Sequence, residues 1–310
     1  MGILEDAGGT TATPRLTAWI ARQRWFANHA TEPHLTVVGS FPLPVDGTEA
    51  RTLLVQDHSP EARALYQVPL VSRPEDPDGI DLGDVVVVDG PRDRGWAAAL
   101  VELALGGGTA GGDGDVTAQG ERLGWAGPPP AVTGTRMLSG EQSNTSVIVT
   151  TATPAGDPGP TVMVKVFRAL HHGENPDVVL QSAIAGAGSR RVPATYGAVV
   201  GEWPDAGRPG GRARGHLAVA QEFLADTEDA WRVALAAARG RIDFAGAARD
   251  LGAATAEVHQ VLAAVLPTVQ ADPAAKRALL AGMRIRAEQA VRSVPSLAGA
   301  ESRIDAVLSA

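Results

Sequence analysis

This sequence of 310 residues contains no cysteine. Disulfide bonds and thiolate metal sites are therefore excluded. It also lacks any apolar run of the about 18 residues that a membrane-spanning helix needs. Residues 1–13 are rich in glycine, alanine and threonine, without the basic and apolar segments of a signal peptide. We therefore expect a cytoplasmic protein that does not insert into membranes.

Positive charge is also scarce. The formal net charge is −8 and the sequence pI is about 5.4, which argues against nucleic acid as the main partner. Lysine is rarer still, because Lys165 and Lys276 are the only two among 27 basic residues. Arginine supplies nearly all the positive charge, so a lysine in a structured segment needs an explanation.

Changes in composition divide the chain into four parts. A helix entered at Pro14 and ending near Trp25, followed by short strands with Pro, Gly and Asp turns, predicts a mainly-β domain over residues 1–90. The expected strands are Leu35–Val38, Arg51–Val55, Ala64–Val71 and Asp84–Val88. Residues 91–131 form an intermediate segment, in which 95–105 are helical and the glycine-dense Gly106–Asp115 is a linker or loop.

The third part, residues 132–225, alternates strands with one helix. Its helix is expected at Pro176–Ala187, with Asn175 as N-cap and Pro176 at the first helical position. Its expected strands are Val132–Leu138, Asn144–Thr150, Thr161–Arg168, Tyr196–Val200 and His216–Phe223, and Pro204–Gly215 is expected to be irregular. Residues 226–310 have helical spacing throughout.

The order strand, tight turn, strand, strand with a central lysine, helix and strand is that of a protein-kinase-like N-lobe. We therefore predict an α+β fold in which a small β domain precedes this lobe and the helical beginning of a C-lobe follows it. In such a lobe, backbone N–H groups of a tight turn approach phosphate oxygens, and a lysine on the third strand reaches the α- and β-phosphates.

Lys165 carries more weight than the turn. It lies in the middle of a strand among valines and a methionine, where an unpaired cation is costly. A surface lysine on a half-buried sheet is the alternative interpretation. In a chain that otherwise uses arginine, the lysine favours a site that needs a compact ammonium group rather than a planar guanidinium.

Four ordered motifs resemble actinobacterial maltokinases, which have an N-terminal cap domain followed by an aminoglycoside-phosphotransferase-like kinase fold. The motifs are Arg22-Gln23-Arg24-Trp25-Phe26, Gly140-Glu141-Gln142-Ser143-Asn144-Thr145-Ser146, Val164-Lys165-Val166-Phe167-Arg168 and Gly173-Glu174-Asn175-Pro176-Asp177. The resemblance covers most of the chain and is weakest between residues 40 and 130. It implies ATP with Mg²⁺ and the phosphorylation of maltose to maltose 1-phosphate for α-glucan synthesis.

The resemblance also implies which residues bind the nucleotide. Lys165 would hold the α- and β-phosphates. The phosphate turn would comprise Gly140, Gln142, Ser143, Asn144 and Thr145, and the hinge beside adenine Gln221, Glu222, Phe223 and Leu224. No catalytic residue and no metal ligand is assigned within this chain.

Two departures from the family pattern bear on activity. Val179 stands where the family has the glutamate that pairs with the lysine, so Glu174 or another carboxylate would have to replace it. None of the seven histidines has an aspartate two residues later, so the His-Gly-Asp type catalytic loop is missing. Asp243-Phe244-Ala245-Gly246 precedes a helix and is interpreted as a turn and N-cap, not as a metal-binding motif.

Several functions remain open at this point. The acceptor of a complete sugar kinase could be maltose or, as in related enzymes, the 6-hydroxyl of glucosamine. We expect these 310 residues alone to be inactive, and the final helix, which has no stop signal, favours a chain that continued. A pseudokinase that binds nucleotide without catalysis, or an α+β protein with no nucleotide site, are the alternatives.

Overall fold

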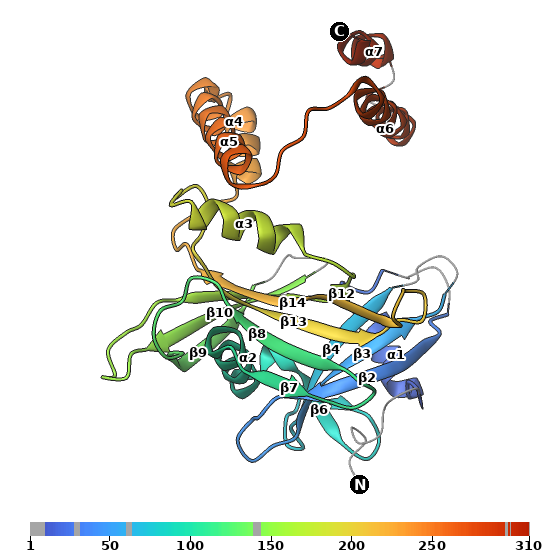
Figure 1. The fold of residues 1–310 in the computed structure, drawn as a ribbon, viewed down its shortest axis with the longest axis vertical. Helices are drawn as coiled ribbons and strands as arrows, with labels where there is room; N and C mark the ends of the chain where they lie inside the picture. Colours follow the sequence, from blue (N-terminus) through green and yellow to red (C-terminus); the bar gives the residue numbers. More distant parts are fainter. Residues whose placement is uncertain are drawn as a thin grey trace. The chain divides into compact units, whose positions relative to one another are not determined.

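The computed structural model describes residues 10–27, 32–59, 64–138, 144–294, 297 and 299–309. The chain divides into two units, Met1–Val265 and Leu266–Ala310. The first unit contains both β-sheets and is the one that matters for the predicted site (Figure 1).

The first sheet is built from the N-terminal part of the chain. Its strands are β1 (Thr10–Thr11), β2 (Leu35–Pro42), β3 (Ala50–Asp57), β4 (Leu65–Ser72), β5 (Ile80–Asp81) and β6 (Val86–Asp89). They are antiparallel in the order β1-β2-β3-β4-β6-β5. Helix α1 (Pro14–Ala21) buries Leu16 and Ile20. The mainly-β character expected for residues 1–90 matches this sheet.

Helix α1 is shorter than expected, because it ends at Ala21 and not near Trp25. The chain turns after Arg22 and places Trp25 and Phe26 in the core of the first sheet, against Tyr66. The Ala27 N–H donates to the Tyr66 hydroxyl at 3.1 Å and fixes this turn. Burying two aromatic rings outweighs the single further helical turn that the apolar spacing favours.

The second sheet is the kinase-like one. Its strands are β7 (Thr109–Gly111), β8 (Thr117–Arg122), β9 (Ala131–Met137), β10 (Asn144–Ala152), β11 (Val162–Phe167), β13 (Thr195–Pro204) and β14 (Arg212–Glu222). They pair in the order β7-β8-β13-β14-β11-β10-β9, and each pair is antiparallel. The α+β class with an N-lobe-like antiparallel sheet is confirmed.

Two segments expected to be irregular belong to this sheet. Gly106–Asp115 contains β7, which pairs with β8, so its glycines do not make it a free linker. Strands β13 and β14 extend into Pro204–Gly215 and leave only a short connection, with Pro204 opposite Arg212. Long-range strand pairing overrides the Pro and Gly content of both segments.

Helices cover both faces of the second sheet (Figure 1). Helix α2 (Arg94–Gly106) packs on β8 and β13, where a Cβ on Gly120 would lie 1.7 Å from the Leu103 carbonyl oxygen. Only a glycine permits this close approach of helix and strand backbone. Helix α3 (Pro176–Gly186) contacts β13 and lies over the opposite face.

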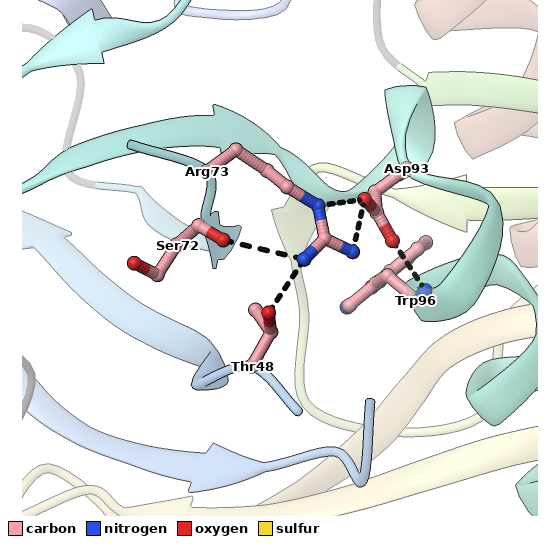
Figure 2. A network of polar contacts seen from close by, with 5 residues as sticks. All are labelled: Thr48, Ser72, Arg73, Asp93 and Trp96. Carbon is pink, nitrogen blue, oxygen red and sulfur yellow. Dashed lines mark hydrogen bonds and ion pairs between the residues drawn. The ribbon is translucent and has the colours of Figure 1, made fainter. Parts of the chain in front are cut away.

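A short 3-10 helix, η1 (Gly90–Arg92), and the start of α2 join the two sheets. The Asp93 carboxylate accepts from the Trp96 N–H at 2.8 Å as the N-cap of α2. The same carboxylate pairs with Arg73 at 2.8 Å, and Arg73 also donates to Thr48 at 2.6 Å (Figure 2). One carboxylate therefore caps α2 and ties it to the end of β4.

Backbone pairing also connects the sheets. Strand β12 (Ala169–Leu170) follows β11 and pairs with β4 of the first sheet. The buried Gln67 side chain of β4 donates to the Phe167 carbonyl at 2.7 Å and to the Leu217 carbonyl at 2.5 Å. Because buried carbonyl groups need donors, Gln67 stabilises the junction of the two sheets.

The remaining helices are α4 (Ala230–Gly240), α5 (Ala245–Val265), α6 (Pro273–Ser293) and α7 (Glu301–Ser309). Helices α5, α6 and α7 bury none of their described residues, and α4 buries only Ala237. Trp231, Ile242 and Leu251 are each more than half exposed. The helical character expected for residues 226–310 is confirmed. No helix in the described ranges is long and apolar enough to span a membrane.

Candidate nucleotide-binding site

Lys165 is the central residue of strand β11. It lies opposite Ser146 of β10 and Val219 of β14 in the two antiparallel ladders. Alternation along β11 buries Val162, Val164 and Val166, whereas Met163 and Lys165 on the other face are only partly buried. The alternation of β11 breaks only at its end, where Phe167 is buried although strand periodicity would place it on the Lys165 face.

The Lys165 ammonium has a carboxylate partner in this structure. Its Nζ lies 2.9 Å from Asp177 Oδ2, and the two side chains are 17% and 49% exposed. A lysine-carboxylate pair is therefore present, and its carboxylate comes from α3, two residues before Val179. The family's Lys–Glu pair is absent, as the sequence indicates, and Asp177, not Glu174, supplies the replacement carboxylate.

The N-terminus of α3 positions Asp177. Asn175 is the N-cap, and its side-chain oxygen accepts from the Asp177 N–H at 2.9 Å. Pro176 occupies the first helical position, where its missing N–H costs nothing. A carboxylate in the first helical turn is also favoured by the helix dipole. The predicted N-cap and proline are confirmed, and they place the Asp177 carboxylate beside β11.

The buried His216 of β14 fixes the segment before α3. Its Nδ1 accepts from the Asn175 N–H at 3.0 Å, so this nitrogen carries no proton. Burial lowers the pKa of His216 below the ordinary value of 6.5, and Arg214 adds to the lowering while Glu121 and Glu174 oppose it. A neutral His216 thus supports the Asn175 cap, and through it Asp177.

Protonation of His216 is expected to destabilise the fold. Because the folded pKa lies below 6.5, the unfolded chain binds the proton more tightly, and stability is lost as pH falls from about 6.5 towards the folded pKa. Urea unfolding between pH 7.5 and 5 should show this loss. His216→Asn should have a shallower pH dependence over this range, and an identical pH dependence in the two proteins would contradict the assignment.

The predicted phosphate turn is only partly within the described residues. Gly140, Gln142 and Ser143 lie outside them, and Asn144 and Thr145 begin strand β10. Thr145 is 7% exposed, and its hydroxyl accepts from Arg168 Nε at 2.8 Å. The Thr145 side chain is therefore directed to Arg168, and the role of this residue in phosphate binding stays a prediction.

The predicted hinge follows the end of β14. Gln221 is buried opposite Met163, and the Glu222 and Phe223 N–H groups donate to the Ala194 and Thr161 carbonyls at 2.8 and 3.1 Å. Within the described residues, the Leu224 N–H has no acceptor, and its side chain is 44% exposed. Leu224 is thus the hinge residue with a backbone donor available to a ligand.

Sequence reasoning missed three residues of this region. Met163 shares the face of Lys165 and lies nearer the hinge, but it was not assigned to the site. Asp177 was visible in the motif but was not connected with Lys165. Arg168 is fully buried, although an arginine at a strand end is ordinarily solvated.

Metal-binding groups are not gathered in the part of the chain that the structure describes, where no three His, Asp or Glu side chains could hold an ion. The Asp243 carboxylate accepts from the Ala245 N–H at 2.9 Å at the start of α5. The interpretation of Asp243–Gly246 as a turn before a helix is confirmed.

The chain is similar to known proteins in its N-terminal part and in its fold. Residues 19–98 match the maltokinase N-terminal cap domain. Two structures of a glucosamine kinase, crystal forms A and B, have the same fold at a TM-score of 0.52 each. They are 24% and 25% identical to this chain and cover 96% and 94% of it. The chain spans 63% and 61% of their length. The predicted resemblance to the maltokinase-like family is confirmed.

Proposed function

Starting from a maltokinase cap domain joined to a kinase-like sheet, we propose that this chain is the nucleotide-binding part of an ATP-dependent sugar kinase. The observation that carries the proposal is the Lys165–Asp177 ion pair at 2.9 Å. A lysine on the third strand of the lobe, held by a carboxylate of the following helix, is the arrangement with which kinases hold the α- and β-phosphates.

The nucleotide would lie on the α3 face of the second sheet. Met163 would contact the adenine ring from the sheet, and the Leu224 N–H would donate to it from the hinge. Lys165 would reach the α- and β-phosphates beyond the ribose. Asn144, at the start of β10, would lie on the phosphate side. Alternation along β11 places Met163 and Lys165 two residues apart on one face, which suits a ligand with an apolar base and an anionic end.

Phosphoryl transfer needs more than these residues. The 310 residues contain no His-Gly-Asp motif to orient an acceptor hydroxyl. Mg²⁺ would enter with the nucleotide, and the described residues offer no cluster that would hold it alone. We therefore propose that the chain binds MgATP and that its part in catalysis is to hold the phosphates by positioning and charge neutralisation.

Two sugars are proposed as the acceptor of the whole protein. The cap domain match over residues 19–98 favours maltose, phosphorylated at its anomeric hydroxyl. The structural likeness to a glucosamine kinase supports glucosamine as the second candidate. The proposed division into a cap over 1–90, an intermediate segment over 91–131, a lobe with hinge over 132–225 and helices over 226–310 accommodates either acceptor.

Calorimetric titration with MgATP and with adenosine tests the proposal. We expect saturable MgATP binding that is tighter than adenosine binding, since only ATP reaches Lys165. Saturable binding by neither ligand, to a chain shown by circular dichroism to be folded, would refute the nucleotide site. A pseudokinase would bind equally well, so turnover with maltose and glucosamine must be measured on a chain that contains a catalytic loop.

Asp177→Asn tests the role of the ion pair. Because Asp177 is half exposed, its loss should change the free energy of unfolding by about 1 kcal/mol or less. Lys165 would lose its carboxylate partner, and we expect MgATP affinity to fall about three- to tenfold while adenosine affinity is unchanged. The matched variant Asp205→Asn, whose partner Arg208 lies in the connection between β13 and β14, should bind like the wild type. Unchanged MgATP affinity in Asp177→Asn would show that the Lys165–Asp177 pair is not part of the nucleotide site.

A further inference from the structure

Arg168 is the most completely buried basic residue among those that the structure describes, with 0% of its side chain exposed. It follows β11 directly, and its side chain lies where the two sheets meet. A guanidinium group without solvent is costly unless charge and hydrogen bonds compensate it. Its partners therefore indicate what the residue does.

Those partners come from both sheets. Arg168 Nη2 pairs with Asp89 Oδ2 at 2.5 Å, at the end of β6 in the cap. The guanidinium carbon lies 5.0 Å from the centre of the Trp25 ring, also in the cap. Arg168 Nε donates to Thr145 Oγ1 at 2.8 Å, in the second residue of β10. One side chain thus connects the cap with the strand that follows the predicted phosphate turn.

The Thr145 contact approaches β10 from the face opposite Lys165. Thr145 lies opposite Val166 in the ladder and is buried with it, whereas Ser146 lies opposite Lys165. Successive side chains of a strand point to opposite faces. The hydroxyl held by Arg168 is therefore turned away from the proposed nucleotide, and Arg168 acts on the site through the start of β10.

The hydrogen bonding of the pair is incomplete. Arg168 Nη1 and Asp89 Oδ1 are both buried, and neither has a hydrogen-bond partner among the described residues. Buried polar atoms are nearly always satisfied, and the exceptions need an explanation. A protein in which both residues of a buried ion pair are replaced by apolar residues is often no less stable. Stability alone does not account for Arg168, which favours a positioning role.

We propose that Arg168 is a positioning residue for phosphate binding, which the cap residues Asp89 and Trp25 hold in place and which fixes the start of β10 through the Thr145 hydroxyl. The cap thereby contributes to MgATP affinity without touching the nucleotide. This inference rests on the proposed function, because it assigns Arg168 to the phosphate side of that same site.

Thr145→Val in the full 310-residue chain tests the proposal. The variant removes the hydroxyl that Arg168 holds and keeps the shape of the side chain. We expect MgATP affinity to fall about five- to tenfold with adenosine affinity unchanged, because the hinge is unaffected. Thr145→Ser keeps the hydroxyl and should restore wild-type affinity. If Thr145→Val does not fold, Thr145→Ala makes the same comparison.

Thr151→Val is the matched control on the same strand. Thr151 is also buried, and its hydroxyl donates to the Pro160 carbonyl at 2.7 Å, towards the other end of β10. Thr151→Val should lose this hydrogen bond and keep the MgATP affinity of the wild type. Equal weakening in both valine variants, or no weakening in Thr145→Val, would overturn the positioning role and leave the nucleotide site standing. A wild-type chain that binds no MgATP would overturn both.

Discussion

Asp89→Asn is expected to lower the free energy of unfolding by about 3–5 kcal/mol, the cost of leaving a buried charge without its partner. Asp89 is 8% exposed and supplies the only carboxylate that pairs with Arg168 in the described residues. Asparagine has nearly the same size, so packing is preserved and the loss reports the missing charge. Urea unfolding at pH 7, followed by tryptophan fluorescence, measures it.

A surface ion pair provides the control for Asp89. Arg92 and Asp78 lie 3.5 Å apart with side chains 43% and 78% exposed, so Asp78→Asn should cost about 1 kcal/mol or less. A similar small effect of Asp89→Asn would show that water reaches Arg168 and that the ion pair is not essential for folding.

Combining Arg168→Met with Asp89→Leu should recover most of the stability that Asp89→Asn loses. Replacing a buried ion pair by apolar residues of similar volume is often neutral or stabilising. The introduced methionine would be an apolar neighbour for Trp25, whose ring now lies 5.0 Å from the guanidinium carbon. MgATP affinity should nevertheless be lower than in the wild type, because no guanidinium group then donates to the Thr145 hydroxyl. The combination thus separates a structural role from a positioning role.

The sequence predicts local features of this fold well. The Asn175 cap and the proline of α3 are each decided by neighbouring residues, and both are confirmed. The kinase-like order of strands and helix could also be predicted from the sequence. That Lys165 needs a partner followed from its position in the middle of an apolar strand, and the structure supplies that partner.

Residues whose environment comes from distant segments could not be predicted. Asp177 reaches Lys165 only because His216 and Asn175 fix where α3 begins, and that requires the pairing of β14. Arg168 is buried because Asp89 and Trp25 come from the cap. Pro204–Gly215 was expected to be irregular because its composition is that of a loop. Strand pairing across the sheet is a long-range property that composition does not contain.

Lys165→Ala should weaken MgATP binding by about 2–3 kcal/mol, or roughly 30- to 150-fold. The proposed interaction joins an ammonium group to phosphate oxygens, and it is lost entirely when the side chain ends at Cβ. Asp177 would then be left facing the phosphates without its cation, which adds repulsion between like charges. Adenosine has no phosphate, so its affinity should not change. Calorimetric titration gives the dissociation constants of MgATP and of adenosine directly.

Lys165→Arg and Lys276→Ala complete the experiment. Arginine keeps the charge, but its planar guanidinium does not fit a position that an ammonium group occupies, so we expect an intermediate affinity. Lys276 is the only other lysine and is exposed on α6, so Lys276→Ala should bind like the wild type. MgATP affinity that is equal in Lys165→Ala and Lys276→Ala would mean that the phosphates do not reach β11. The Lys165–Asp177 pair would then be a surface ion pair, and a sugar kinase built on this lobe would need another cation for its phosphates.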